Sequence, residues 1–294
     1  MADLLKQNTF KVVGRLVSQD LKTLNRKDNG AGFISGNIIV EANLGGAKNE
    51  FEISFYANEK TQDGKVSALY TQYSKLGDLV GKKIEVTGDM RESRFWSSNA
   101  NQMVSAQKLN GRFVHGVAET TQDEGTWELG GFVVEGLKER TNKDGDIYRY
   151  DLTLGQANYK GDSMSRFVLH INPSDAEIVA GVGKYSVGQT VQVNGDLRFI
   201  VTETRSERKN EGGFGEPVVR VYTNRQRNFF ITGGSAPIVS AEAGMYSSEV
   251  IRNLVAAYKA ADVQLAEKGK NGNGGSQQEE EVVTRVSNKQ ASLI

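Results

Sequence analysis

The chain has 294 residues, a length typical of about two domains. Its 36 Lys and Arg residues balance 36 Asp and Glu residues, so the formal net charge is zero, and it contains no cysteine. This composition excludes disulfide bonds, thiolate metal sites and a strongly basic protein body. The opening MADLLKQNTF lacks the apolar run of a signal peptide, and no stretch approaches the roughly 20 apolar residues of a membrane span. We therefore expect a cytoplasmic protein with no membrane partner.

The most informative feature of the sequence is an eleven-residue frame that occurs twice. It reads GKKIEVTGDMR at 81–91 and GQTVQVNGDLR at 188–198. Apolar residues alternate with polar ones in both copies, which predicts a half-buried strand. Gly88 and Gly195 fall on the apolar face, where a glycine favours a sharp bend, as in a small sheet that coils into a barrel.

The repeat extends beyond this frame in both directions. Apolar segments recur in the same order in the two copies: 9–17 with 126–134, 51–56 with 167–171, and 112–116 with 229–233. A short candidate helix precedes the frame at 67–80 and again at 173–182. Three strands, a helix and two further strands is the order of the OB-fold. We therefore predict an all-β chain of two tandem OB-fold barrels, at 8–117 and 124–234, with a pair of β-sandwiches as the alternative.

The C-terminal part of the sequence differs from the repeats. Residues 245–267 form an amphipathic pattern, because apolar side chains recur at spacings of three and four from Ile251 to Leu265. Such a helix could pack back on an OB-fold, pair with another chain or bind a partner, and we rank the three in that order. Residues 268–294 are polar and rich in glycine, which predicts a flexible tail.

The segment YSKLGDLVGKKIEVTGDMRESRFW at 73–96 resembles the bacterial single-stranded-DNA-binding protein family. The family pattern begins with the end of a helix and a turn that contains glycine. A strand follows, whose last residues include a glycine, an apolar residue and an arginine. A basic residue and a tryptophan come after the strand. Residues that fit it are Gly81, Val86, Gly88, Arg91, Arg94 and Trp96, with one extra residue before the tryptophan. The second copy keeps Arg198 and has Phe199 as its aromatic residue. Two fused OB-folds and a C-terminus without the family's acidic tip depart from the usual pattern and resemble a bacteriophage-type member.

Sequence-tolerant binding of single strands requires flat faces for the bases and cations for the phosphates. The aromatic candidates are Tyr56, Trp96, Tyr148, Tyr150, Phe199 and Phe214. Trp96 is expected at the start of a loop and Tyr56 on the exposed face of its strand. Tyr148 and Tyr150 share a face, which is either exposed or packed inside.

The basic candidates lie in the first turn of each repeat, beside the repeated strand and in a glycine-rich loop at 203–217. They are Lys22, Arg26, Lys27, Arg91, Arg94, Lys138, Arg140, Lys143, Arg198 and Arg205. OB-folds bind oligonucleotides on strands two and three and through the adjoining loops, which is where these clusters fall. A solvated polar loop is the alternative for each cluster.

The resemblance implies a non-enzymatic protein that coats single-stranded DNA in replication, recombination or repair, in the host cytoplasm if the source is viral. It implies neither a cofactor nor a metal, and protein partners would dock through the C-terminal helix and tail. The two histidines, His115 and His170, lie in different repeats, and no phosphate-binding Walker loop is present, so we expect no enzymatic activity. The alternatives are an adaptor that uses OB-folds to bind protein and an RNA-binding protein.

Overall fold

The structure is a computed structural model that describes residues 4–27, 30–98, 100–208, 218–241 and 243–270, with backbone only at 203–208 and 218–222. It is mostly β-sheet with a C-terminal helix. The first half contains β1 (Asn8–Gln19), β2 (Lys22–Asn25), β3 (Gly32–Leu44), β4 (Ala47–Asn58), α1 (Ala68–Tyr73), the 3-10 helix η1 (Leu76–Leu79), β5 (Lys83–Ser97) and β6 (Gln102–Gly116). The second half contains β7 (Glu124–Thr141), β8 (Ile147–Ala157), β9 (Met164–Ile171), α2 (Ala176–Val182), β10 (Thr190–Arg208) and β11 (Val218–Gly234).

The two halves have the same pattern of strand pairing. In the first half β1 pairs with β3 and β5, β3 with β4, and β5 with β6, while β4 meets β6 in parallel. In the second half β7 pairs with β8 and β10, β8 with β9, and β10 with β11, while β9 meets β11 in parallel. Each half therefore closes a ring of pairings, and the duplication inferred from the sequence is present in the topology. Strand β2 is an addition to the first half, inside the segment expected to be a turn.

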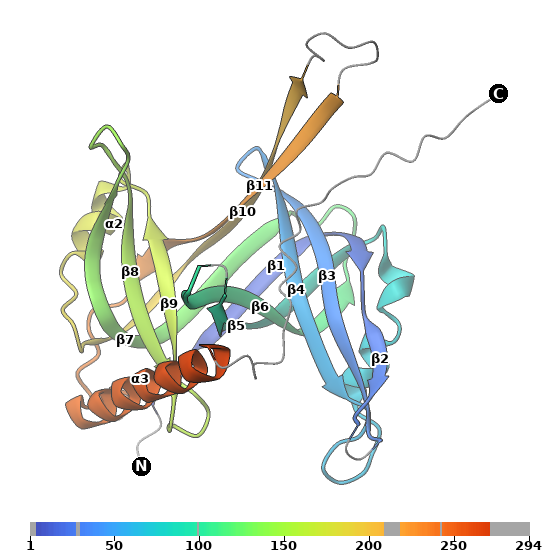
Figure 1. Ribbon diagram of the computed structural model, residues 1–294, viewed down its shortest axis with the longest axis horizontal. Helices are drawn as coiled ribbons and strands as arrows, with labels where there is room; N and C mark the ends of the chain where they lie inside the picture. The colour runs from blue at the N-terminus through green and yellow to red at the C-terminus, as the bar shows by residue number, and fades with distance from the viewer. Residues whose placement is uncertain (1–3, 28–29, 99, 209–217, 242, 271–294) are drawn as a thin grey trace.

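An antiparallel contact between β1 and β7 joins the halves into one sheet of 11 strands. Its register places Phe10 opposite Trp127, with Asn8 opposite Leu129 and Val12 opposite Gly125 at equal distances on either side. The equivalent first strands of the two repeats therefore meet around a local two-fold relation. Figure 1 shows the resulting lobes, with β5 and β6 between them and the β10–β11 pair extending away from both.

The glycines of the repeated frame have equivalent structural roles. Gly81 and Gly188 have φ values of 84° and 87°, which favour glycine. Their N–H groups donate to the carbonyl oxygens of Leu16 and Val133 at 2.7 and 2.8 Å. Further along, Gly88 and Gly195 each lie at a register shift between the fourth and fifth strands. The two glycines on which the sequence predicts a bend thus both mark an irregularity in the strand pairing.

The last helix, α3 (Ser248–Lys270), packs on the chain itself, which was the first of the three expected alternatives. Its buried residues Leu254 and Tyr258 join a second core cluster with Phe132 and Tyr246. Figure 1 shows α3 across the end of the lobe formed by β7, β8 and β9. Residues 268–270, expected in a flexible tail, are helical, and the rest of that predicted tail lies outside the described residues. No helix in the described part of the chain has the length and apolar character needed to cross a membrane.

Candidate nucleic-acid interface

The outer face of β3 and β4 carries an aromatic pair with an arginine beside it. Tyr56 is 45% exposed, and its ring centroid lies 5.6 Å from that of Phe33. An Nη group of Arg26 donates to Tyr56 Oη at 2.6 Å and to Asn58 Oδ1 at 3.0 Å, and Tyr56 Oη donates to Asn58 at 2.7 Å. We call Phe33, Tyr56, Asn58 and Arg26 the aromatic platform. It combines flat apolar faces with a fixed cation, the two requirements for holding a base and its phosphate.

Strand alternation and a short turn build this platform. Phe55 and Ala57 are buried, so Tyr56 and Asn58 face outward on β4. Phe33 lies opposite Asn58 in the antiparallel register and therefore on the same face. Arg26 follows β2, where its N–H donates to the carbonyl of Ala31 at 2.9 Å. Lys22 and Lys27, in the same connection, are exposed, and Lys22 Nζ lies 3.3 Å from an Asp20 carboxylate oxygen.

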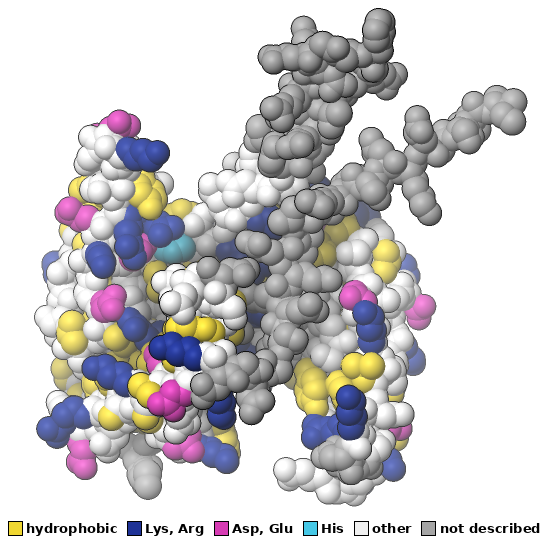
Figure 2. Space-filling model, viewed as in Figure 1, with side chains coloured by type: hydrophobic (Ala, Val, Ile, Leu, Met, Phe, Trp, Pro, Cys, Tyr) yellow, Lys and Arg dark blue, Asp and Glu magenta, His cyan; other side chains and the backbone are white. Residues whose placement is uncertain are grey.

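The second half presents a cationic face on β7 and β8. Arg140 lies opposite Arg149, and Lys138 lies opposite Asp151. Lys138 and Lys143 are exposed. Figure 2 shows Lys and Arg side chains gathered beside a histidine on this lobe. We call Lys138, Arg140, Arg149 and Asp151 the arginine cluster.

The two tyrosines of β8 have different environments. Tyr148 is 56% exposed near the end of the strand, and the Arg149 guanidinium lies 5.7 Å from its ring centroid. Tyr150 lies on the same face but packs against the core. The sequence left open whether the face shared by these tyrosines is exposed or packed inside. Tyr148 is exposed, whereas Tyr150 is packed.

His170 on β9 lies opposite Asp151 of β8 and therefore beside the arginine cluster. It is buried, and its Nδ1 accepts a hydrogen bond from the Phe229 N–H at 3.3 Å. Burial, together with the nearby guanidinium groups of Arg149 and Arg140, lowers the pKa of His170 to about 4, although the Asp151 carboxylate opposes this shift. The imidazole is therefore neutral at neutral pH and serves as a hydrogen-bond acceptor.

We expect this histidine to make folding sensitive to mild acid. Above pH 6.5 it is neutral in both the folded and the unfolded chain, and stability is unaffected. As the pH falls from 6.5 towards 4, this histidine becomes protonated in the unfolded chain but stays neutral in the folded chain. The free energy of unfolding therefore decreases. The free energy of unfolding should fall by about 2 kcal/mol between pH 7 and pH 5 from this group.

Urea unfolding of His170→Asn at the two pH values checks this expectation. Asn retains an acceptor oxygen near the position of Nδ1 but does not titrate, so the variant should lose less stability than the wild type. His115→Asn, at the exposed histidine of the first half, is the comparison variant. An equal loss in His170→Asn and the wild type would contradict the assignment.

The β5–β6 pair does not offer the free surface that the sequence predicted. Trp96 lies within β5, paired with Met103, and not at the start of a loop. The last turn of α3 covers it: Gly269 is in direct contact with the indole, and Lys270 Nζ lies 5.2 Å from the ring centroid. Trp96 is therefore half-buried rather than freely exposed. Arg91 remains exposed, with Nε 2.9 Å from Asp89.

Arg94 is also covered by α3. Its guanidinium lies 3.9 Å from the ring centroid of Tyr258, and Nη1 donates to Asp262 at 2.7 Å. Burial and the Glu92 carboxylate raise the pKa of Tyr258, whose hydroxyl donates to Glu92 at 2.6 Å. These contacts fasten α3 to the first half, so Arg94 acts in this structure as an anchor for the helix.

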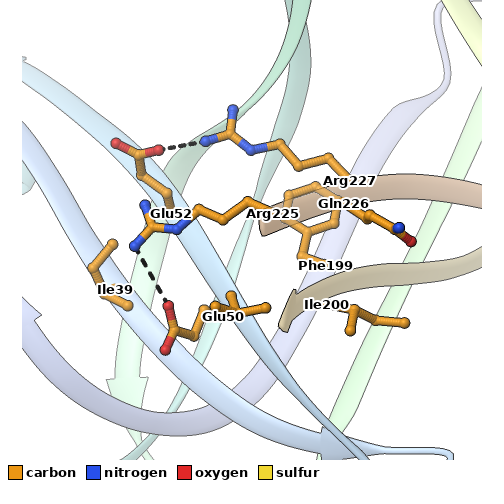
Figure 3. A pocket seen from close by; sticks show the side chains of 9 residues that line it. Ile39, Glu50, Glu52, Phe199, Ile200, Arg225, Gln226 and Arg227 are labelled. Atoms are coloured by element: carbon orange, nitrogen blue, oxygen red, sulfur yellow. Dashed lines mark hydrogen bonds and ion pairs between the residues drawn. The ribbon is translucent and has the colours of Figure 1, made fainter. Parts of the chain in front are cut away.

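The β10–β11 pair crosses the first half and adds to its surface. Arg225 and Arg227 lie 3.7 and 2.6 Å from Glu50 and Glu52 of β4 (Figure 3). Phe199 lies beneath them and is only 3% exposed, with its ring centroid 5.2 Å from that of Phe51. The prediction of an exposed aromatic at Phe199 is thus corrected, because the apolar alternation of β10 continues to this residue.

The remaining predicted residues of this segment have mixed outcomes. Arg198 is partly exposed, with an Nη group 2.8 Å from Asp196 on the same strand. The backbone of Arg205 pairs with Val221, but its side chain is outside the described part of the structure. Phe214 lies outside the described residues altogether. The role of the glycine-rich loop at 203–217 in binding a strand therefore stays a prediction.

Residues 6–271 match the family model of YorF. The chain belongs to the YorF family. No protein with a curated description matches this sequence.

The fold of this YorF-family chain is similar to that of solved single-stranded DNA binding proteins. The wild-type single-stranded DNA binding protein of Thermus aquaticus is 13% identical, with a TM-score of 0.50 over 80% of this chain and 95% of that one. A deletion mutant of the same protein is 13% identical, with a TM-score of 0.48 over 85% of this chain and 100% of that one. At this identity the wild-type likeness concerns the fold alone.

Some residues of this surface were missed by the sequence reasoning. Phe33 precedes an apolar run, and only the register with β4 shows that it faces outward. Arg149 lies between the two tyrosines in the sequence. Its spacing of two residues from Asp151 places both on one face of a strand, which could have indicated that they interact. Arg225 and Arg227 alternate on one strand, which could have marked a basic face.

Proposed function

We propose that this chain consists of two tandem OB-folds and is a non-enzymatic protein that binds single-stranded DNA without sequence preference. Each half has the strand order of an OB-fold and a short helix before its fourth strand. The two-half chain shares its fold with the Thermus aquaticus protein, whose name states that it binds single-stranded DNA. Both facts support the proposal, as do the residues of the surface.

The aromatic platform is the observation that carries this function. It occupies the outer face of the second and third OB strands and the connection before them, which is where OB-folds bind oligonucleotides. Each stacked base contributes roughly 1–3 kcal/mol. A few exposed rings with adjacent cations can therefore support binding by a chain whose net charge is zero.

The biological role that follows is the coating of transient single strands in replication, recombination or repair. Two OB-folds would cover roughly 8–32 nucleotides at about 4–16 nucleotides per fold. Because the folds are linked, binding of one raises the effective concentration of DNA at the other. The buried face of α3 is occupied by its own chain, so a partner protein would meet its outer face or the residues that follow it.

Fluorescence anisotropy with an end-labelled oligo-dT of about 35 nucleotides, long enough for both folds, tests the proposal. A label is needed because Trp127 is buried and Trp96 is covered by α3, so neither indole is a dependable reporter. Saturable binding that weakens with added salt is expected. No binding at low salt would overturn the proposal and favour the protein-binding adaptor. Stronger competition by oligo-rU than by unlabelled oligo-dT would identify RNA as the ligand.

A further inference from the structure

The arginine cluster of the second half is organised around a buried carboxylate. Asp151 is only 3% exposed. Arg140 Nε donates to one carboxylate oxygen at 2.6 Å, and Arg149 Nε lies 2.8 Å from the other. The two oxygens of a single aspartate are thus each paired with a different arginine, one from β7 and one from β8.

This arrangement brings like charges together. Arg140 and Arg149 are directly opposite each other in the antiparallel register, a position in which two guanidinium groups repel. Lys138 lies opposite Asp151 and adds a third cation on the same face. A single carboxylate does not neutralise three cations, so the cluster keeps a net positive charge. Asp151 fixes where that charge lies.

Arg140 and Lys138 face solvent, the Arg149 side chain is partly exposed at 25%, and the carboxylate is buried. The Arg140 side chain is 42% exposed, against 4% for that of Asp151. Both arginines meet Asp151 through Nε, and among the described residues no hydrogen bond uses a terminal Nη group of either. The Nη edge of a guanidinium matches two oxygens of a phosphate, and it binds best when the side chain is already held in place.

We propose that Asp151 is a positioning residue that holds Arg140 and Arg149 as a preformed binding site for a backbone phosphate of single-stranded DNA. The inference rests on the proposed function and adds Arg149 to the residues that bind the ligand. A structural role alone, in which Asp151 only ties β7 to β8, makes a different prediction for the same substitution.

The substitution Asp151→Asn separates the two roles. It removes a negative charge and raises the net charge of the chain by one, so general electrostatics predicts tighter binding of oligo-dT and an unchanged or steeper salt dependence. If Asp151 positions the arginines, binding should instead weaken by about tenfold at low salt. The slope of log affinity against log salt should also fall, by about 0.7 for each phosphate that the variant no longer binds.

Asp144→Asn is the matched control, because Asp144 is exposed in the turn between the same two strands and contacts neither arginine. It should bind as well as the wild type or slightly better. Arg149→Lys is the second variant: it keeps the charge but loses the planar fork, and it should also weaken binding. Thermal melts by circular dichroism show whether each variant is folded.

The outcomes are distinct. Weaker binding by folded Asp151→Asn with a reduced salt slope, while Asp144→Asn is unaffected, supports the proposal. Binding by Asp151→Asn equal to or tighter than the wild type overturns it without affecting the proposed function. If Asp151→Asn does not fold, Arg149→Lys decides, and wild-type affinity in that variant overturns the proposal. Failure of the wild type itself to bind overturns the proposed function and this inference together.

Discussion

Gly195→Ala is expected to destabilise the protein by about 3 kcal/mol or more, one of the largest losses that a single methyl group can cause. An alanine Cβ at this position would lie less than 3.0 Å from the carbonyl oxygen and carbon of Phe230. These are backbone atoms of the adjacent strand β11, so the clash can be relieved only by moving the sheet. Gly88→Ala should behave alike, because its Cβ would meet the carbonyl of Asn110 in the same way.

The measurement is urea unfolding followed by circular dichroism. Gly116→Ala is the control, since Gly116 also lies in a strand of the repeat and no described atom is within 4 Å of its Cβ position. We expect that variant to stay within about 0.5 kcal/mol of the wild type. Wild-type stability in both Gly88→Ala and Gly195→Ala would show that the strands relax easily and that the shared glycines do not shape them.

These glycines also show why much of the fold could be predicted from the sequence. The first strands of the two repeats share a glycine at the equivalent position, Gly14 and Gly131. At each of them the strand passes close to the backbone of the strand with which it pairs. Two strands that approach this closely require a glycine, because any Cβ would clash. The close approach is therefore visible in the sequence as a glycine at the same place in both repeats. The existence of two equivalent halves could therefore be inferred before the pairings were known.

The site was less predictable, because exposure depends on contacts between distant segments. Trp96 was expected to be free, and it is covered by a helix that starts more than 150 residues later in the chain. Phe199 was selected by resemblance to a family aromatic, although it continues the apolar alternation of Leu197 and lies under the crossing of β10 over β4. The local alternation of β10 could have predicted the burial of Phe199, whereas no local pattern predicts that α3 lies against Trp96.

The two halves differ in what they offer to a ligand. The first carries the exposed ring of Tyr56 beside the half-buried ring of Phe33, and the second carries the paired guanidinium groups of Arg140 and Arg149. Stacking tolerates any base, whereas guanidinium groups recognise the phosphates that all strands share. Under the proposed function, base contacts dominate in the first half and phosphate contacts in the second. Salt should therefore weaken Arg149-dependent binding more than Tyr56-dependent binding.

Tyr56→Ala should have the largest effect on ligand binding of any substitution in the first half. It removes the more exposed ring of the aromatic platform and the hydroxyl that accepts from Arg26, so the variant loses the larger part of the stacking surface and one of the two hydrogen bonds that hold Arg26. The expected loss is roughly 1–3 kcal/mol, or about 5- to 150-fold in the affinity for oligo-dT. The residue faces outward, so the melting temperature should change little.

Tyr56→Phe separates the two contributions, because it keeps the ring and removes only the hydroxyl. If stacking dominates, this variant should bind close to the wild type while Tyr56→Ala does not. If the hydroxyl matters by fixing Arg26, the two variants should lose affinity alike. Tyr159→Ala is the control for a general loss of surface aromatic area, since Tyr159 is 92% exposed and lies away from the platform, beyond β8. Wild-type affinity in Tyr56→Ala would remove the platform from the interface and shift attention to the arginine cluster, whose contribution does not depend on any exposed ring.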